Sequence, residues 1–284
     1  MVEVYVASAF SKDGAGGNKA GVVLERPDLN AVEKMAIAKE LGYSETAFVC
    51  AAEGGKTFSL EYFTPTDEVP LCGHATIASF VVLWLLGKVS AGTYSIITKA
   101  GHLSVRVEAD GTVFMEQNPP AYGEILSVQE LCGCVAEDAV EKSRPVQIVS
   151  TGLPDILLPV RSVEALAQLR PDFERMTEVS RLKNAVGFHA FALAEDGGIT
   201  AVCRNFAPLY GIDEESATGT ASCALACYLF RHHEKKEQYV FEQGYSLDLP
   251  SRITVNLVCS GDAIEQVWVG GQGILVEKKE LFCG

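Results

Sequence analysis

Two short segments of this chain place a glycine directly ahead of an apolar stretch. They are Cys72-Gly73-His74-Ala75 and Thr218-Gly219-Thr220-Ala221. The stretch that follows each one is predicted to be a buried helix, whose first N–H groups lack partners and whose dipole favours an anion. Because glycine lets a ligand approach the backbone closely, the two segments predict a small-carboxylate site. The alternative is that Gly73 and Gly219 only permit helix–strand packing.

Glu45 is the candidate acid–base residue. It directly precedes the apolar segment 46–51, which is predicted to be a strand. A carboxylate held at the end of such a strand can both take and return a proton. The aligned residue in the second half is Phe188, which cannot titrate, so Glu45 is expected to act as the single base. The alternative is a solvated glutamate at a strand edge.

Acidic side chains also precede both predicted helices. Four of them are expected to stabilise the helix starts: Asp67, Glu68, Asp213 and Glu214. Glu215 has no acidic equivalent in the first half, so we expect it in the site instead. His74 aligns with Thr220, which does not titrate, and is a plausible hydrogen-bond donor to a substrate.

An internal duplication relates the two halves. Residues 46–65 and 189–208 are identical at eight of twenty positions, where average residue usage predicts about one or two. Two domains of similar topology are therefore expected, residues 1–122 and 123–284, with the site in a cleft between them. Asn118-Pro119-Pro120 is the expected exit from the first domain.

The hydrophobic pattern indicates a mixed α+β chain. A first helix is expected at 31–41, capped by Asp28, and two apolar helices are expected to begin at Gly73 and Gly219. The strands expected in the first half cover residues 2–9, 21–25, 46–51, 57–63, 93–99, 102–108 and 112–117.

Composition excludes several classes of function. With 37 acidic and 23 basic residues, the net charge of −14 disfavours nucleic acid and anionic membranes as partners. The first residues do not resemble a signal peptide, and a cytoplasmic location is expected. Nine cysteines, Cys132 and Cys134 among them, lack zinc-ligand spacing, so no structural zinc is expected.

These motifs resemble the PhzF (phenazine biosynthesis-like) family over nearly the whole chain. The resemblance rests on the following runs: Gly17-Asn18-Lys19-Ala20-Gly21, Tyr43-Ser44-Glu45-Thr46-Ala47-Phe48, Phe63-Thr64-Pro65, Glu68 to Thr76, Arg204 to Pro208 and Gly211 to Ala221. It implies the diaminopimelate-epimerase-like fold, in which each of two domains wraps a mostly antiparallel sheet around a central apolar helix. It also implies a homodimer and a cofactor-independent isomerase acting on a small carboxylate-bearing metabolite similar to 2,3-dihydro-3-hydroxyanthranilate.

The resemblance assigns roles to individual residues. Glu45 would be the proton shuttle, and the substrate-binding residues would be Asn18, Gly73, His74, Glu215, Gly219 and Thr220, with no metal. The family usually has Asp-Pro where this chain has Glu215-Ser216. An amino-acid epimerase, a dehydratase and a non-catalytic binding protein remain alternatives. A racemase with two thiols is disfavoured because Thr218 aligns with Cys72.

Overall fold

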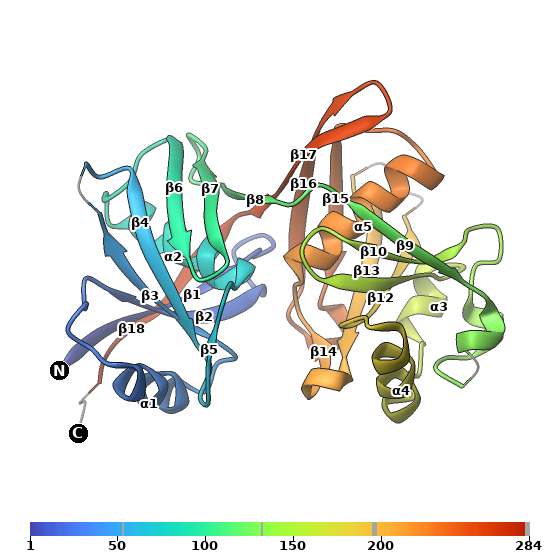
Figure 1. Cartoon of the computed structure of the whole chain (residues 1–284), viewed down its shortest axis with the longest axis horizontal. Helices are drawn as coiled ribbons and strands as arrows, with labels where there is room; N and C mark the ends of the chain where they lie inside the picture. The colour runs from blue at the N-terminus through green and yellow to red at the C-terminus, as the bar shows by residue number, and fades with distance from the viewer. Residues whose placement is uncertain (53, 132, 195–197, 282–284) are drawn as a thin grey trace. The chain divides into compact units, whose positions relative to one another are not determined.

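The computed structural model describes residues 1–52, 54–131, 133–194 and 198–281, and the chain divides into two compact units (Figure 1). Unit 1 comprises Met1–Glu116 with Gly270–Gly284, and unit 2 comprises Gln117–Val269. Cys132, one of the nine cysteines, lies outside the described residues. Cys134 itself is buried in a hydrophobic cluster of unit 2.

Unit 1 is a mixed sheet around one long helix. Its helices are α1 (Ala31–Leu41) and α2 (Gly73–Leu85). Its strands are β1 (Val2–Ala9), β2 (Asn18–Leu24), β3 (Thr46–Ala51), β4 (Thr57–Phe63), β5 (Glu68–Val69), β6 (Gly92–Thr98), β7 (Gly101–Val107), β8 (Val113–Gln117) and β18 (Gly273–Leu281). The pairs β2–β3 and β4–β6 are parallel, whereas β18–β1, β1–β2, β3–β4, β4–β5, β6–β7 and β7–β8 are antiparallel.

Unit 2 repeats this plan. Its helices are α3 (Val163–Ala167), α4 (Phe173–Lys183) and α5 (Gly219–His232), with short 3-10 turns at Val128–Leu131, Glu137–Ala139, Pro208–Tyr210 and Tyr245–Leu247. Its strands are β9 (Ala121–Leu126), β10 (Val146–Ser150), β11 (Pro154–Pro159), β12 (Gly187–Leu193), β13 (Ala201–Ala207), β14 (Ile212–Glu215), β15 (Gln238–Gln243), β16 (Ser251–Ser260) and β17 (Ala263–Gly271). The pairs β11–β12 and β13–β15 are parallel, as are their counterparts in unit 1. The duplication seen in the sequence is therefore a duplication of topology.

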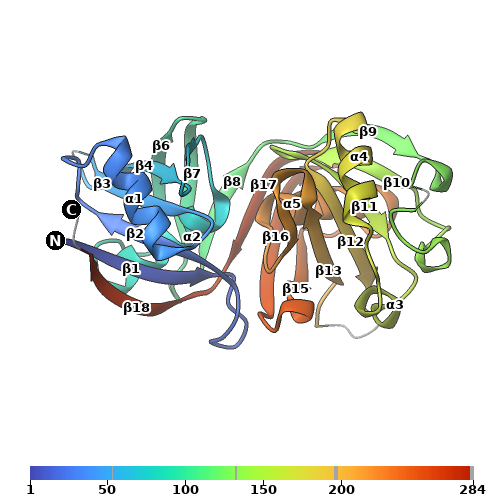
Figure 2. The same cartoon turned by 90° about the horizontal axis from the view of Figure 1, so that it is seen from below.

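The last strand of the chain belongs to the first unit. β18 pairs antiparallel with β1, and Figure 2 shows the two strands side by side. In unit 2 the equivalent place, beside β10, is taken by β9 from the middle of the chain. The division therefore differs from the expected 1–122 and 123–284. The sequence comparison assumed two consecutive copies, whereas the C-terminal strand returns to complete the first sheet.

Both central helices are apolar on all sides. Every residue from His74 to Leu83 in α2 is buried, as is every residue from Ala221 to Phe230 in α5. A helix without a polar face can be stable in water only if it is enclosed by other elements. α2 packs on β1, β2, β3 and β18, and α5 packs on β10, β11 and β16 (Figure 2). The expected helix starts at Gly73 and Gly219 are confirmed.

The cap of α1 differs from the prediction. The helix spans the expected residues, but its N-cap is Asn30, whose side chain accepts from the backbone N–H groups of Val32 and Glu33. Glu33 in turn accepts from the Asn30 N–H, which completes a capping box. Asp28 instead pairs with Arg26. Asp28 is the first suitable cap residue in the sequence, but the spacing of Asn30 and Glu33 is that of a capping box and predicts the cap at Asn30.

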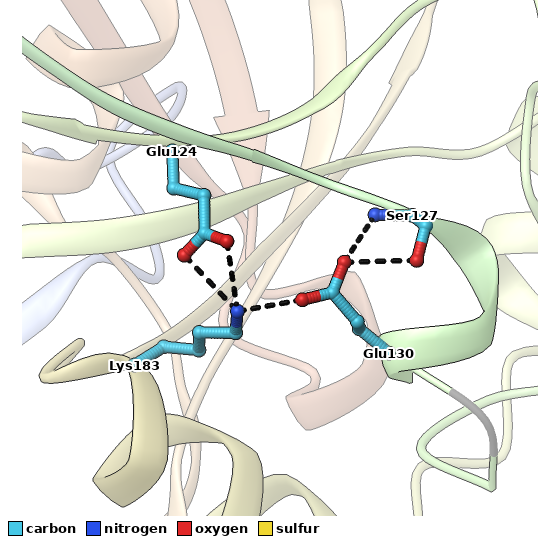
Figure 3. Close-up of polar contacts among 4 residues, drawn as sticks. All are labelled: Glu124, Ser127, Glu130 and Lys183. Atoms are coloured by element: carbon cyan, nitrogen blue, oxygen red, sulfur yellow. Dashed lines mark hydrogen bonds and ion pairs between the residues drawn. The ribbon is translucent and has the colours of Figure 1, made fainter.

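A lysine fixes the end of α4 in unit 2 (Figure 3). Lys183 Nζ lies 3.0 Å from a Glu124 carboxylate oxygen and 2.6 Å from Glu130 Oε1. Glu130 also accepts from the Ser127 N–H and hydroxyl at 2.8 Å each. The hydrogen bond from Lys183 is the main cause that lowers the pKa of Glu130, to about 2. These contacts join α4 to β9 and to the turn that follows it.

None of the helices within the described residues combines the length and apolar character needed to cross a membrane.

Candidate functional site

The start of α2 has no side-chain cap. Cys72 occupies the N-cap position in extended conformation, and its side chain makes no capping hydrogen bond. Thr76 stabilises this first turn instead, because its Oγ1 donates to the Cys72 carbonyl at 2.8 Å. The same Oγ1 lies 2.6 Å from Tyr62 Oη. Backbone N–H groups at an uncapped helix start are the usual donors to a bound anion.

Glu45, Cys72 and His74 lie together at this helix start. His74 Nε2 is 3.3 Å from Glu45 Oε2, and His74 Nδ1 is 3.4 Å from Cys72 Sγ. Cys72 and His74 are buried, and the Glu45 side chain is 20% exposed. Glu45 Oε2 is itself buried and has no hydrogen-bond partner among the described residues, so its contact with His74 is a close approach and not an aligned hydrogen bond.

Gly73 is not required for packing. Apart from its two chain neighbours and the backbone of its own helix, a Cβ atom built on Gly73 would meet no atom of the described residues within 4 Å. In unit 1, this removes the alternative that the glycine only lets the helix approach a strand. The open space above Gly73 is instead what close approach of a ligand to the helix start requires.

Asn18 begins β2, the strand next to β3. Gly17, which precedes it, has a φ of +80°, and an added Cβ would lie 2.3 Å from the Ala9 carbonyl oxygen, so only glycine fits there. Three residues after Asn18, the Gly21 N–H donates to the Glu45 carbonyl at 3.3 Å. The Gly17–Gly21 segment is thus hydrogen-bonded through Gly21 to the backbone of Glu45 and helps to position it.

The start of α5 repeats the arrangement in unit 2. Thr218 occupies the N-cap without making a capping hydrogen bond. Ser222 Oγ donates to the Thr218 carbonyl at 2.8 Å, as Thr76 does to Cys72. Thr220 is partly exposed, and its carbonyl accepts from Thr151 Oγ1 at 3.2 Å. Both helix starts therefore leave backbone N–H groups without side-chain caps.

Glu215 is held in place beside this second helix start. Thr218 Oγ1 donates to Glu215 Oε2 at 2.5 Å, and Gln243 Nε2 donates to the Glu215 carbonyl at 2.7 Å. Gly244, which follows Gln243 in the chain, has a φ of +84°, and an added Cβ would lie 2.2 Å from the Leu249 carbonyl oxygen. Glycine is therefore required at position 244. Glu215 and Thr220 thus flank the same helix start.

Two of the other acidic residues do not cap the helices as expected. Glu214 forms a bidentate pair with Arg204 at 2.8 and 2.9 Å, and Glu68 pairs with Lys99 at 2.6 Å. These partners are not evident from the sequence, because Arg204 and Lys99 are distant in sequence from Glu214 and Glu68 and approach them only in the folded chain.

Asp155 in unit 2 was not predicted as a site residue from the sequence. Asp155 lies on β11 and is only 3% exposed. Burial is the main cause that raises the pKa of Asp155, to about 8, and the negative charge of Glu215 adds to the effect. The available signal was a single acidic residue at the start of the apolar run Ile156-Leu157-Leu158. Such a perturbed carboxyl group beside Glu215 is typical of functional sites.

His189 is a second buried polar group of unit 2. Its Nδ1 is 3.0 Å from Asn205 Oδ1, whereas its Nε2 has no hydrogen-bond partner among the described residues. Burial lowers the pKa of His189 to about 4, so the ring is neutral at pH 7. The preceding residue, Phe188, is fully buried in the hydrophobic cluster with Met176 and Phe206, so its ring is part of the core.

The fold places the chain in a structural class that includes proline-type epimerases. A hydroxyproline epimerase from Agrobacterium vitis aligns with 99% of this chain and 90% of its own at a TM-score of 0.63, with 12% identity. A PhzF-family protein from Bacillus anthracis is more similar, with a TM-score of 0.89, 28% identity and 99% coverage of both chains. The two-unit α+β architecture is that of the PhzF proteins.

The family follows from the sequence match. The profile described as phenazine biosynthesis-like protein (PhzC-PhzF) matches residues 7–279, so this chain belongs to that family. Uncharacterized isomerase YfhB of Bacillus subtilis is 34% identical over 93% of each chain. The human phenazine biosynthesis-like domain-containing protein is 30% identical over 84% of this chain and 87% of its own.

Proposed function

We propose that this isomerase of the phenazine biosynthesis-like family moves a proton between two carbon atoms of a small carboxylate-bearing metabolite, with Glu45 as the only proton shuttle. One observation carries the proposal. Glu45 Oε2 is buried beside His74 at an uncapped helix start, and it has no hydrogen-bond partner among the described residues. A buried carboxylate oxygen without a hydrogen-bond donor can accept a proton from a substrate.

The proposed reaction balances without a further reactant. Glu45 takes a proton from one carbon of the substrate, and the electron pair of the broken C–H bond shifts along the adjoining double bond. His74 donates a hydrogen bond to the substrate as negative charge develops. Glu45 then returns its proton to the carbon that has gained the electron pair, so one C–H bond is broken and another is formed.

The carboxylate of the substrate needs its own binding site. We assign it to the backbone N–H groups at Gly73, with Asn18 as a further binding residue of unit 1. For the equivalent helix start of unit 2, we assign ligand binding to Gly219, Glu215 and Thr220. A crystal structure with a bound small carboxylate would test the assignment, because the ligand should contact the backbone at Gly73. A carboxylate bound away from both helix starts would contradict it.

Solvent-deuterium exchange is the direct test of the reaction. Candidate carboxylates, 2,3-dihydro-3-hydroxyanthranilate among them, are incubated with the protein in D₂O and analysed by NMR and mass spectrometry. An isomerase changes the structure of its substrate, and the product gains solvent deuterium wherever the proton on Glu45 exchanges with D₂O before it returns to carbon. Tight binding of such a compound without any isomerisation or exchange would favour the binding-protein alternative.

A further inference from the structure

We propose that Glu45, Cys72 and His74 bind Zn²⁺ or a similar thiophilic divalent cation, and that the bound cation blocks the proton shuttle. The binding rests on the side-chain geometry alone, whereas the inhibition also rests on the proposed function. Such a cation would be an inhibitor rather than a structural element or a cofactor, because it occupies the two side chains that the proposed reaction needs.

The spacing of the three ligand atoms fits one small cation. Sγ of Cys72, a ring nitrogen of His74 and a carboxylate oxygen of Glu45 all lie within 4.8 Å of one another. The separation is 3.3 Å between His74 Nε2 and Glu45 Oε2, and 3.9 Å between the same nitrogen and Cys72 Sγ. Ligands of a tetrahedral zinc ion, at about 2.0–2.3 Å from the metal, lie roughly 3.3–3.6 Å apart. Only small side-chain movements are needed.

The ligand types select the kind of cation. One thiolate, one imidazole and one carboxylate suit zinc and other thiophilic ions rather than Mg²⁺ or Ca²⁺, which prefer oxygen ligands. Three protein ligands leave a fourth position for water, as in zinc sites that are open to solvent. On binding, the Cys72 S–H bond breaks, the sulfur coordinates the cation, and the proton leaves to solvent.

The ligands come from two firmly held segments. Cys72 and His74 flank Gly73 at the start of α2, where Thr76 holds the Cys72 carbonyl. Glu45 directly precedes β3, and its carbonyl accepts from the Gly21 N–H. The chelating geometry thus exists before any cation arrives, which reduces the entropy cost of binding.

The duplicated unit supplies an internal comparison. At the positions equivalent to Glu45, Cys72 and His74, unit 2 has Phe188, Thr218 and Thr220. None of these is a usual zinc ligand, so the equivalent place in unit 2 cannot bind the cation. We therefore expect one such cation per chain.

Titration with Co²⁺ and Zn²⁺ tests the site. Reduced, chelator-treated protein is titrated with Co²⁺, and a sulfur-to-cobalt charge-transfer band reports coordination by a thiolate. Calorimetry with Zn²⁺ gives stoichiometry and affinity. The matched variants are Cys72→Ser and Glu45→Gln, and the control is Cys50→Ser, which alters a half-buried thiol on β3. Circular dichroism confirms that each variant is folded.

The proposal predicts one charge-transfer site that Cys72→Ser abolishes and Cys50→Ser leaves intact. Glu45→Gln should keep the charge-transfer band and weaken Zn²⁺ binding by roughly tenfold or more. Mutating a residue that only hydrogen-bonds to a metal ligand already costs about tenfold, and Glu45 is proposed as a ligand itself. Unchanged cobalt spectra in Cys72→Ser, or unchanged zinc affinity in both variants, would overturn it. Zinc binding without any exchange activity on a substrate would contradict the proposed function alone.

Discussion

His74 Nε2 lies 3.3 Å from Glu45 Oε2, so the base proposed for the reaction and the proposed hydrogen-bond donor are direct neighbours. Glu45 precedes β3 and His74 is the second residue of α2, and both elements belong to unit 1. The pair therefore depends on how one unit folds. Substitutions in it should affect chemistry and leave unit 2 folded.

Replacing the base should remove turnover. Glu45→Gln keeps the size of the side chain but cannot shuttle a proton, so exchange should fall by roughly 10²–10⁴-fold. Cys72→Ala should cost much less, because Thr218 offers no second thiol for a two-base mechanism. Solvent-deuterium exchange measures both, with ligand binding checked separately. Loss of exchange in the Cys72 variant, with exchange retained by Glu45→Gln, would make the thiol the base and favour the epimerase alternative.

Adding a methyl group at Gly73 should weaken ligand binding without destabilising the fold. Because an added Cβ meets nothing within 4 Å, Gly73→Ala should melt at the wild-type temperature or slightly above it. The methyl group should nevertheless obstruct a carboxylate at the helix start and weaken its binding by about tenfold or more, equal to about 1.4 kcal/mol. Calorimetry with a turned-over substrate and thermal melting provide the two readouts. Unchanged affinity would show that the carboxylate binds elsewhere.

Asp155 should make the protein less stable as the pH rises. Because its pKa is raised to about 8, Asp155 in the folded protein keeps a proton that it releases near pH 4 in the unfolded chain. The stability of the folded state therefore falls between about pH 4 and pH 8. Asp155→Asn is neutral throughout, so its melting temperature should exceed that of wild type at pH 8, and the gain should shrink towards pH 4.

The matched control for Asp155 is Asp138→Asn, whose side chain is 78% exposed. That variant should follow the wild-type pH profile. A lower melting temperature for Asp155→Asn at pH 8 would mean that the Asp155 carboxylate is ionised and paired in the folded protein.

The sequence revealed the parts of the fold that depend on local pattern and on repetition. The starts of α2 and α5 were predicted because both helices are apolar and each follows a glycine. The close contact of Glu45 with His74 and the burial of Asp155 were not predicted. Both depend on which strands and helices become neighbours, and a pattern read along one chain does not contain that information. The Arg204–Glu214 pair was missed for the same reason.

Removing the lysine that links α4 to β9 should destabilise unit 2. Lys183→Met leaves Glu124 and Glu130 without their shared cation, so the melting temperature should fall more than in the control Lys142→Met, whose single ion pair is exposed. Since the pKa of Glu130 is lowered to about 2, its contribution is present above about pH 4 and lost as the pH falls towards 2. Equal melting temperatures for the two variants at neutral pH would contradict this prediction.

Metal removal should leave the fold intact. The cysteines lack zinc-ligand spacing, so we expect that no zinc is needed for folding. Circular dichroism and thermal melting of the reduced protein should be the same before and after exhaustive chelation. Unfolding on chelation would reveal a structural zinc and would direct attention to Cys132 and Cys134.

The pairing of β18 with β1 has a consequence for synthesis on the ribosome. The strand that completes unit 1 is translated after every strand of unit 2. Until β18 has been made, the sheet of unit 1 is therefore incomplete, and one edge of β1 lacks the strand that pairs with it. An exposed strand edge of this kind is prone to aggregation. Loss of β18 should thus harm unit 1, the part of the chain that is made first, and the site at Glu45 with it.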